Sequence, residues 1–375
     1  MNTIGHFEPP PGLGGTVGHV NIIGRVGTLA VALGIGVGLV TTPGVASAKP
    51  SDGTNSSTES NSASSKPDKA PKAAKPPKPE KSVSVSKNGV VTKQRGTAFA
   101  VTPEGSTGTR ARARGDYAVA AVNSGNNNTA TANGTNARAV INGGTNNHAT
   151  ATGDNSTAYA GSDRDNSSNN NTATVRGDNS SAEAGYRGSD NSNNTATVTG
   201  DNSQAFAGSN GSGNHNNNAT VIGNYSTAWA GVADPGNTGN TGNSNNTATA
   251  NGDRAGAYAG YGSNNTGNNA AATNTEEAGA AGAYAGTFGS NNTNNTAVAT
   301  NSGDNSAAVA AAGINGNNNT NNTATATNTV DNNGFTEARA GSDSSNNTGE
   351  TATATNGETD IQPPPPPPSG GGPGA

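Results

Sequence analysis

One short motif, repeated about eleven times, constrains the fold of this chain more than any other feature. A clear copy is NTATVTGDNSQAFAG at residues 194–208, and NTATVRGDNSSAEAG at 171–185 precedes it. Each half of the motif alternates with a period of two residues, which is the period of a β-strand. Gly-Asp-Asn between the halves is typical of a turn. The first alanine of the motif is expected at Ala111, Ala130, Ala149, Ala173, Ala196, Ala219, Ala248, Ala271, Ala297, Ala324 and Ala352.

Copies with constant strands and variable loops predict a solenoid, in which successive coils stack and pair their strands. The chain is only 29% hydrophobic and 3% aromatic, whereas an ordinary globular domain is nearly half apolar. A core of large side chains is therefore excluded. Either the chain is largely disordered, or alanine fills the interior of a thin fold. The strict alternation over so many copies favours the thin fold.

The orientation of the strands follows from the residue that lies between the two alanines of the second half. That position holds charged as well as aromatic side chains, and arginine and glutamate are rarely buried without a partner. We therefore expect the alanines to face inward and this column to face solvent. The column is expected to contain Arg138, Tyr159, Glu183, Phe206, Trp229, Tyr258, Tyr284, Val309 and Arg339.

The chain is thus predicted to be an all-β, thin, Ala-cored β-solenoid with two short strands per coil and about eleven coils, flanked by disordered termini. Its coils are expected to stack at ~4.8 Å spacing, and its Asn-rich corners are expected to form amide ladders. The expected segments are a signal peptide at 1–48 with cleavage after Ala48, a disordered Ser/Pro/Lys-rich linker at 49–81, capping strands at 82–102, the solenoid at 103–357 and a disordered Pro/Gly-rich tail at 358–375.

The leader indicates export. Residues 26–48 carry no charge, follow Arg25 and end on the small residues Ala-Ser-Ala. This order is typical of a secretory signal peptide, and an uncleaved membrane anchor is the alternative. The stretch IGRVGTLAVALG at 23–34 resembles the leaders of mycobacterial and other actinobacterial exported proteins. The resemblance implies a secreted, cell-wall-associated or cell-surface-associated protein.

The repeats also resemble known surface proteins. GDNSQAFA at 200–207 is similar to the head repeats of trimeric autotransporter adhesins, and NTATV at 194–198 is similar to curli-type repeats. Both resemblances imply a structural or adhesive role. The leading hypothesis is a secreted or cell-envelope structural/adhesive repeat protein, and a disordered cell-wall spacer is one alternative. Expected partners are an envelope polysaccharide or the surface of a host or other cell, with self-association through the solenoid ends.

No pattern in the sequence predicts catalysis. The four histidines are isolated, no nucleophile and base recur in phase, and cysteine is absent, so we expect no enzyme activity, cofactor or metal site. The net charge is −5 and the repeats show no clustered basic run, so no nucleic-acid partner is expected. The Arg-Gly-Asp tripeptides at 114–116 and 176–178 fall at the strand-to-corner junction, and we interpret them as corner features.

Two outward columns are candidate binding surfaces. The first is a grid of threonines that resembles the arrays of ice-binding β-solenoids, although threonine is also simply a good polar strand residue. The grid is expected to be interrupted by Arg176, Ile222, Asn251, Ala272, Asn274 and Val298. Its predicted members are Thr150, Thr152, Thr197, Thr199, Thr325, Thr327, Thr353 and Thr355.

The second candidate surface is an aromatic column on the other face of the coils. Exposed aromatic side chains in a row can stack on sugar rings or on a partner protein. The alternative is a ladder of cross-strand contacts that only stabilises the chain itself. Its predicted members are Tyr159, Phe206, Trp229, Tyr258 and Tyr284.

Overall fold

The computed structural model describes residues 81–162, 167–233, 241–332 and 334–362. The predicted signal peptide, nearly all of the linker and the end of the tail lie outside these ranges. All described residues belong to one compact unit of the chain. Within the described ranges, the chain forms no helix that could cross a membrane.

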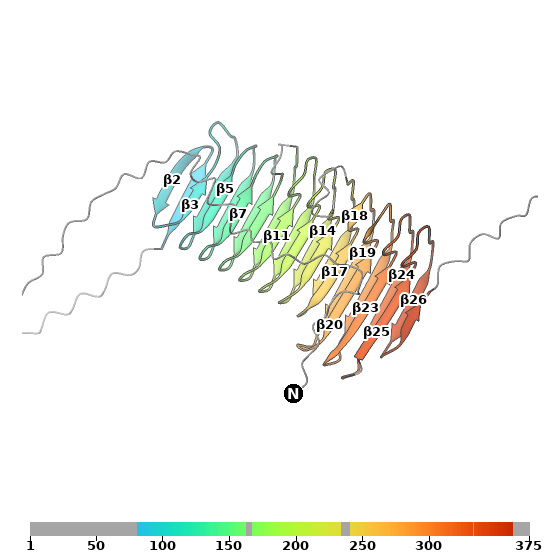
Figure 1. The fold of residues 1–375 in the computed structure, drawn as a ribbon. Coiled ribbons are helices and arrows are strands. Elements are labelled where there is room, and N and C mark those ends of the chain that lie inside the picture. The colour runs from blue at the N-terminus through green and yellow to red at the C-terminus, as the bar shows by residue number, and fades with distance from the viewer. Residues whose placement is uncertain (1–80, 163–166, 234–240, 333, 363–375) are drawn as a thin grey trace, which may run out of the picture. The chain divides into compact units, whose positions relative to one another are not determined.

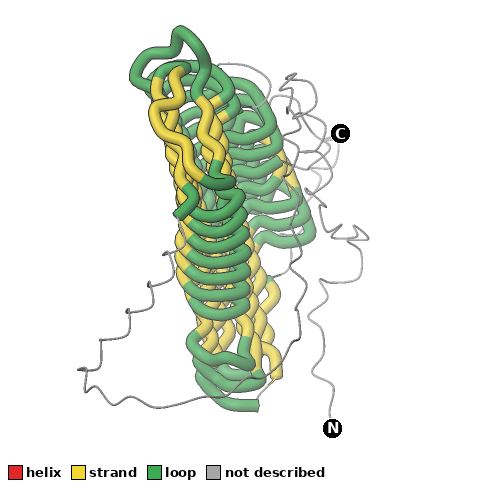
Figure 2. Tube along the Cα trace, turned by 90° about the vertical axis from the view of Figure 1, so that its left-hand side faces the viewer, coloured by secondary structure: helices red, strands yellow, loops and turns green. Residues whose placement is uncertain are grey.

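The described residues form a β-solenoid made of two long sheets, as predicted. A strand of the first sheet and a strand of the second alternate along the chain in eleven pairs, from β4 (Arg110–Arg114) and β5 (Val119–Val122) to β26 (Thr351–Thr355) and β27 (Thr359–Ile361). Figure 1 shows these strands stacked in chain order, and Figure 2 shows the loops that connect them as a second stack. From β4 onward, every pairing between neighbouring coils is parallel.

The strands have the following bounds. In order across the first sheet they are β2 (Val90–Arg95), β1 (Val83–Lys87), β4 (Arg110–Arg114), β6 (Thr129–Asn133), β8 (His148–Thr152), β10 (Thr172–Arg176), β12 (Thr195–Thr199), β14 (Asn218–Ile222), β16 (Thr247–Asn251), β19 (Asn269–Asn274), β22 (Thr296–Asn301), β24 (Thr323–Asn328) and β26 (Thr351–Thr355). In the second sheet they are β3 (Phe99–Val101), β5 (Val119–Val122), β7 (Arg138–Ile141), β9 (Thr157–Ala160), β11 (Ser181–Ala184), β13 (Gln204–Ala207), β15 (Thr227–Ala230), β17 (Ala255–Ala259), β20 (Ala280–Ala285), β23 (Ser306–Ala312), β25 (Gly334–Ala340) and β27 (Thr359–Ile361). A short pair, β18 (Gly262–Ser263) and β21 (Gly289–Ser290), lies outside both sheets.

Alanine lines the interior, as the alternation predicted. Ala196 and Val198 of β12 and Ala205 and Ala207 of β13 are fully buried and belong to one cluster that runs through all the coils. The bulkiest apolar side chains in this interior are only valines and one isoleucine, Ile141. Because the interior side chains are so small, each coil buries little apolar surface, and hydrogen bonds between coils carry much of the order.

The strand register corrects three of the predicted positions. Ala248 pairs with Ala270 rather than with Ala271, so Ala270 is the inward first alanine of that coil. In the outward column of the second sheet, Val140 stands beside Tyr159 where Arg138 was expected. Ala311 stands beside Tyr284 where Val309 was expected. At Ala271 and Val309 the errors come from neighbouring runs of consecutive alanines, because such runs contain no alternation that could fix the phase. At Arg138 the alternation begins one step early, at the buried Ala137, so the outward position before the column was taken for the column itself.

Buried asparagines form a ladder along one corner of the coils, which confirms the expected amide ladders. The Oδ1 of Asn194 accepts both the backbone N–H of Asn217 at 3.1 Å and its Nδ2–H at 3.0 Å. The Nδ2 of Asn217 also donates to the carbonyl of Asn243 at 3.0 Å. Each rung therefore satisfies polar groups that the thin interior would otherwise bury unpaired. The rungs are Asn128, Asn147, Asn171, Asn194, Asn217, Asn246, Asn268, Asn295 and Asn322.

Later coils gain a third side, which the sequence pattern did not predict. Single-residue parallel bridges link Ser192, His215, Ser244, Thr266, Thr293, Thr320 and Thr348 in turn. A second ladder runs beside them through Asn191, Asn214, Asn243, Asn265, Asn292, Asn319 and Asn347. The longer loops of these coils are thus ordered by inward asparagines of their own.

The two ends of the solenoid are closed differently. At the start, β1 carries buried serines in place of alanines, and the Oγ of Ser84 accepts the backbone N–H of Ala100 at 3.0 Å. At the finish, the carboxylate of Asp360 accepts the N–H of Thr353 on the edge strand β26 at 2.8 Å. The expected boundary at residue 357 is corrected, because β27 continues the second sheet through Ile361.

Candidate functional site

The outward side of the first sheet from β6 to β26 is a regular array that we call the threonine face. Its middle column holds threonine in six successive coils, from Thr131 to Thr249. All eight predicted threonines lie on this face and are half-buried or exposed. Thr150, Thr197, Thr325 and Thr353 stand in the middle column, and Thr152, Thr199, Thr327 and Thr355 stand in the column on its C-terminal side.

A third column on the N-terminal side widens the predicted grid. Its residues lie two positions before those of the middle column, in the same period-two alternation, so the sequence pattern already indicated this column. Here His148 interrupts the threonines, and its Nε2 lies 3.0 Å from the Oγ1 of Thr150; burial lowers the pKa of His148. The threonines of this column are Thr129, Thr172, Thr195, Thr247, Thr296, Thr323 and Thr351.

The interruptions of the face differ partly from those predicted. Arg176, Ile222, Asn251 and Val298 occupy outward positions as expected. Ala272 and Asn274 do not interrupt the face, because both are buried inside the coil. Ala271 is the outward residue there, and Thr273 continues the column beside it.

The geometry of the threonine face is that of a two-dimensional lattice. Neighbouring strands lie about 4.8 Å apart, and outward residues repeat about every 6.8 Å along each strand. Each threonine presents one hydroxyl, which can donate and accept, and one methyl group. Because threonine is branched at Cβ, its χ1 is restricted. The face can therefore offer hydroxyl and methyl groups in fixed repetition to a surface of matching regularity.

The predicted aromatic side chains are brought together on the second sheet, where they pack on one another. Phe206 meets Trp229 edge-on at 5.8 Å between ring centroids, and Trp229 meets Tyr258 edge-on at 4.8 Å. Tyr258 and Tyr284 are stacked at 5.2 Å. Glu183 stands between Tyr159 and Phe206 in the register and separates them. We call the register positions from Tyr159 to Tyr284 the aromatic column.

Further rings from the turns cover the aromatic column. Tyr186 stacks on Tyr159 at 4.7 Å, and Tyr261 lies 5.5 Å from Trp229. Tyr159 is only 6% exposed. Burial raises the pKa of the Tyr258 phenol, and the neighbouring Tyr284 adds to the rise. The expectation that this column faces solvent is therefore wrong for part of it, because turn residues fold back over the sheet.

Basic side chains gather where the first sheet begins. Arg110, Arg112 and Arg114 all point outward from β4, next to the paired strands β1 and β2. The expectation that the repeats carry no clustered basic run is wrong for the first coil. Three of the arginines alternate within the local run Arg110–Arg114, so the sequence contained this part of the signal. The antiparallel pairing of β1 then adds the basic side chains of β1 and β2.

The Arg-Gly-Asp tripeptides lie at the ends of β4 and β10, as interpreted. Gly177 has φ +153°, and a Cβ there would collide with the carbonyl of Gly200 in the next coil. One oxygen of Asp178 accepts the backbone N–H of Asp154 at 2.7 Å. Gly177 and Asp178 thus contact the corners of the neighbouring coils, which agrees with the interpretation of the tripeptide as a corner feature.

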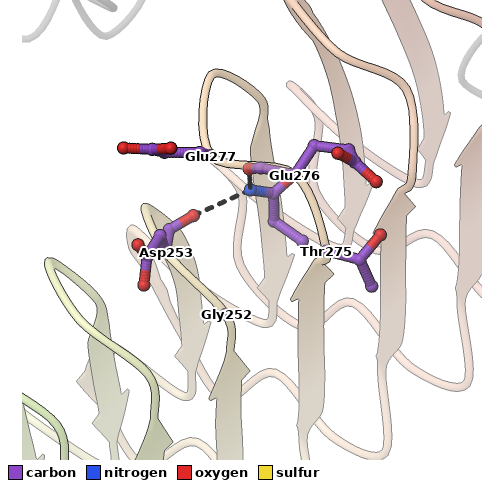
Figure 3. A pocket seen from close by; sticks show the side chains of 6 residues that line it. Gly252, Asp253, Thr275, Glu276 and Glu277 are labelled. Atoms are coloured by element: carbon purple, nitrogen blue, oxygen red, sulfur yellow. Dashed lines mark hydrogen bonds between the residues drawn. The ribbon is translucent and has the colours of Figure 1, made fainter.

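The described residues hold no group of three or more acidic or histidine side chains that could bind a metal ion. A hollow beside the turn after β19 is lined by Asp253, Glu276 and Glu277, among others. Figure 3 shows that the side chains of Glu276 and Glu277 extend in opposite directions. The Nδ2 of Asn274 donates to the carbonyl of Asp253 at 2.9 Å. The hollow therefore offers no convergent set of ligands.

No protein-family model matches this chain, and neither a curated protein nor a solved structure is significantly similar to it.

Proposed function

We propose that this chain is an exported, non-enzymatic structural and adhesive protein whose threonine face contacts an extended, repetitive surface, with an envelope polysaccharide as the partner. The observation that supports this proposal most strongly is the register of the threonines over successive coils. A flat face without a pocket suits a partner that is itself long and repetitive, because many weak contacts then add along its length.

The aromatic column contributes less to the proposed contact. Its rings already pack on each other and on the turn residues Tyr186 and Tyr261. A ring that is engaged on both faces has no free face for a sugar. The alternative of a self-stabilising ladder is therefore favoured for this column.

Export is supported by the sequence of the leader. The uncharged run at 26–48 and the Lys/Pro-rich segment that follows it suit a protein that crosses a membrane and is then held away from the cell. The proposed location is the cell wall or the medium. Self-association through the solenoid ends stays a prediction.

The proposal is tested by pull-down of the full-length chain with purified envelope polysaccharide. The test variant is T174Y/T197Y, which places two large side chains in the middle column of the threonine face. The matched control is T157Y/T227Y, which makes the same changes at outward positions of the second sheet. We expect the first variant to lose binding and the control to keep it. Equal binding by both variants, or no binding by the wild-type chain, would contradict the proposal.

A second candidate function, ordering of water at an ice surface, is favoured by the pairing of a hydroxyl and a methyl group at each lattice point of the face. Thermal hysteresis of the full-length chain tests it. The wild type should show hysteresis that T174Y/T197Y abolishes and T157Y/T227Y retains. A wild-type chain without hysteresis removes this candidate. The disordered-spacer alternative is wrong for the described residues, which form a folded solenoid.

A further inference from the structure

The first strands of the first sheet carry a cluster of cationic side chains on their outward side. β1 pairs antiparallel with both β2 and β4, which places Arg95, Val83 and Arg114 in one row across the sheet. Lys93, Val85 and Arg112 form the next row. Directly opposed residues of an antiparallel pair share one face. The basic patch defined by this pairing consists of Lys87, Lys93, Arg95, Arg110, Arg112 and Arg114.

The charge of the basic patch is not balanced by neighbouring carboxylates. The two ion pairs found among the described residues both involve Arg339, in a distant coil. Asp116 follows Arg114 at the corner, where its Oδ1 accepts the hydroxyl of Ser82 and it forms no ion pair, so its single charge faces six cations. Glu104 lies beside the turn between β1 and β2, and it forms no ion pair. The patch is therefore a concentrated positive surface on a chain whose net charge is −5.

Arg112 lies at the centre of this surface and lacks a partner. Its Nε is buried and has no hydrogen-bond partner. Burial lowers the pKa of Arg112, and the neighbouring charges of Arg114 and Arg110 lower it further. An anion bound over the patch would accept a hydrogen bond from this guanidinium and offset the repulsion among the three arginines.

We propose that the basic patch binds an anionic polysaccharide, a glycan with a carboxylate on its repeating sugars. The patch continues without a break into Thr129 and Thr131 of the next strand, which pair with Arg110 and Arg112 and can hydrogen-bond sugar hydroxyls. It presents no aromatic side chain on which bases could stack, as single-stranded nucleic acids require. The patch is a flat sheet face, whereas proteins that read double-stranded DNA insert a helix or a two-stranded ribbon into its major groove. This proposal does not depend on the proposed function of the threonine face.

The test uses the full-length chain and polygalacturonate, with fully methyl-esterified polygalacturonate as the neutral probe. The variant R110Q/R112Q/R114Q removes three charges from the patch. The control R138Q/R187Q/R254Q removes three arginines that lie outside the first sheet, so both proteins have the same net charge. The six lysines at 66–81 give the same background in all three proteins. Circular dichroism and thermal melting verify that each variant is folded.

We expect the wild type to bind the charged probe and not the neutral one. The patch variant should bind about tenfold more weakly, since three charge contacts at the surface are lost, and with a shallower salt dependence. The control should change less than about twofold. Equal loss in both variants would overturn the proposal. It would also be overturned by tighter binding to a DNA duplex or to anionic vesicles at physiological salt, or by self-association of the wild type that the patch variant alone loses.

Discussion

The two outward faces of the solenoid, the threonine face and the aromatic column, differ in what they contribute. On the first sheet, short polar side chains stand half-exposed in a lattice. On the second sheet, the rings of Phe206, Trp229, Tyr258 and Tyr284 form a continuous series of contacts. An interior of alanines offers little apolar burial, whereas each aromatic ring buries on the order of 150–250 Å². The fold therefore gains apolar stabilisation outside its core from the rings on the second sheet, whereas the threonine face on the first sheet remains available for contact with a partner.

The largest effect should come from truncating the centre of the aromatic column. W229A removes contacts with Phe206, Tyr258 and Tyr261. We expect a loss of about 2 kcal/mol in the free energy of unfolding, below the cost at a fully buried site because Trp229 is half-exposed. Urea denaturation measures it, with W229F as the control that keeps a ring. If W229A lowers the free energy of unfolding no more than a threonine-face substitution does, the aromatic column does not contribute more to stability than the threonine face.

Alkaline pH should weaken the aromatic column selectively. Burial raises the pKa of Tyr258 and Tyr284 above the ordinary value of about 10. The folded chain therefore holds phenolic protons that the unfolded chain releases. The stabilisation is fully present below about pH 10 and is lost as pH rises through the folded-state pKa values. Thermal melting across this range measures it, and Y258F/Y284F should flatten the dependence. A dependence that is unchanged in this double variant would assign the effect to other groups.

Filling the gap in the aromatic column should stabilise the chain. Glu183 is 4% exposed and separates Tyr159 from Phe206. E183F would extend the ring contacts across this coil, and we expect a gain of about 1 kcal/mol. The melting temperature measures it, with E183Q separating the effect of charge from that of the ring. A melting temperature below that of E183Q would show that the ring does not fit.

The smallest effect on stability should come from the threonine face. T197A removes a half-exposed hydroxyl and methyl group, and we expect a change within about 0.5 kcal/mol. The same variant should weaken polysaccharide binding, because the lattice loses a central point. Urea denaturation and the pull-down assay on one protein preparation measure both. A large loss of stability would show that the face is structural after all.

Much of the fold could be predicted because the motif alternates strictly. The alternation placed Ala196 inside and Thr197 outside, and all eight predicted threonines lie on one face. The prediction failed where the pattern is degenerate. In Ala270-Ala271-Ala272 the register is fixed by the buried asparagines on either side, Asn268 and Asn274, which hydrogen-bond to asparagines of neighbouring coils. Asparagine in a loop and asparagine in a ladder look alike in sequence, so the third side at Ser192 and beyond was missed.

By itself, the sequence determined the solenoid class, the inward alanines and the outward threonines, because strand alternation is a local property of the chain. Only the tertiary structure decided which outward surfaces are free. The rings at Tyr186 and Tyr261 fold back from turns onto the aromatic column. The antiparallel pairing of β1 brings Lys93 and Arg112 onto one patch. Both outcomes depend on contacts between residues in different coils or strands, and no local pattern encodes such contacts.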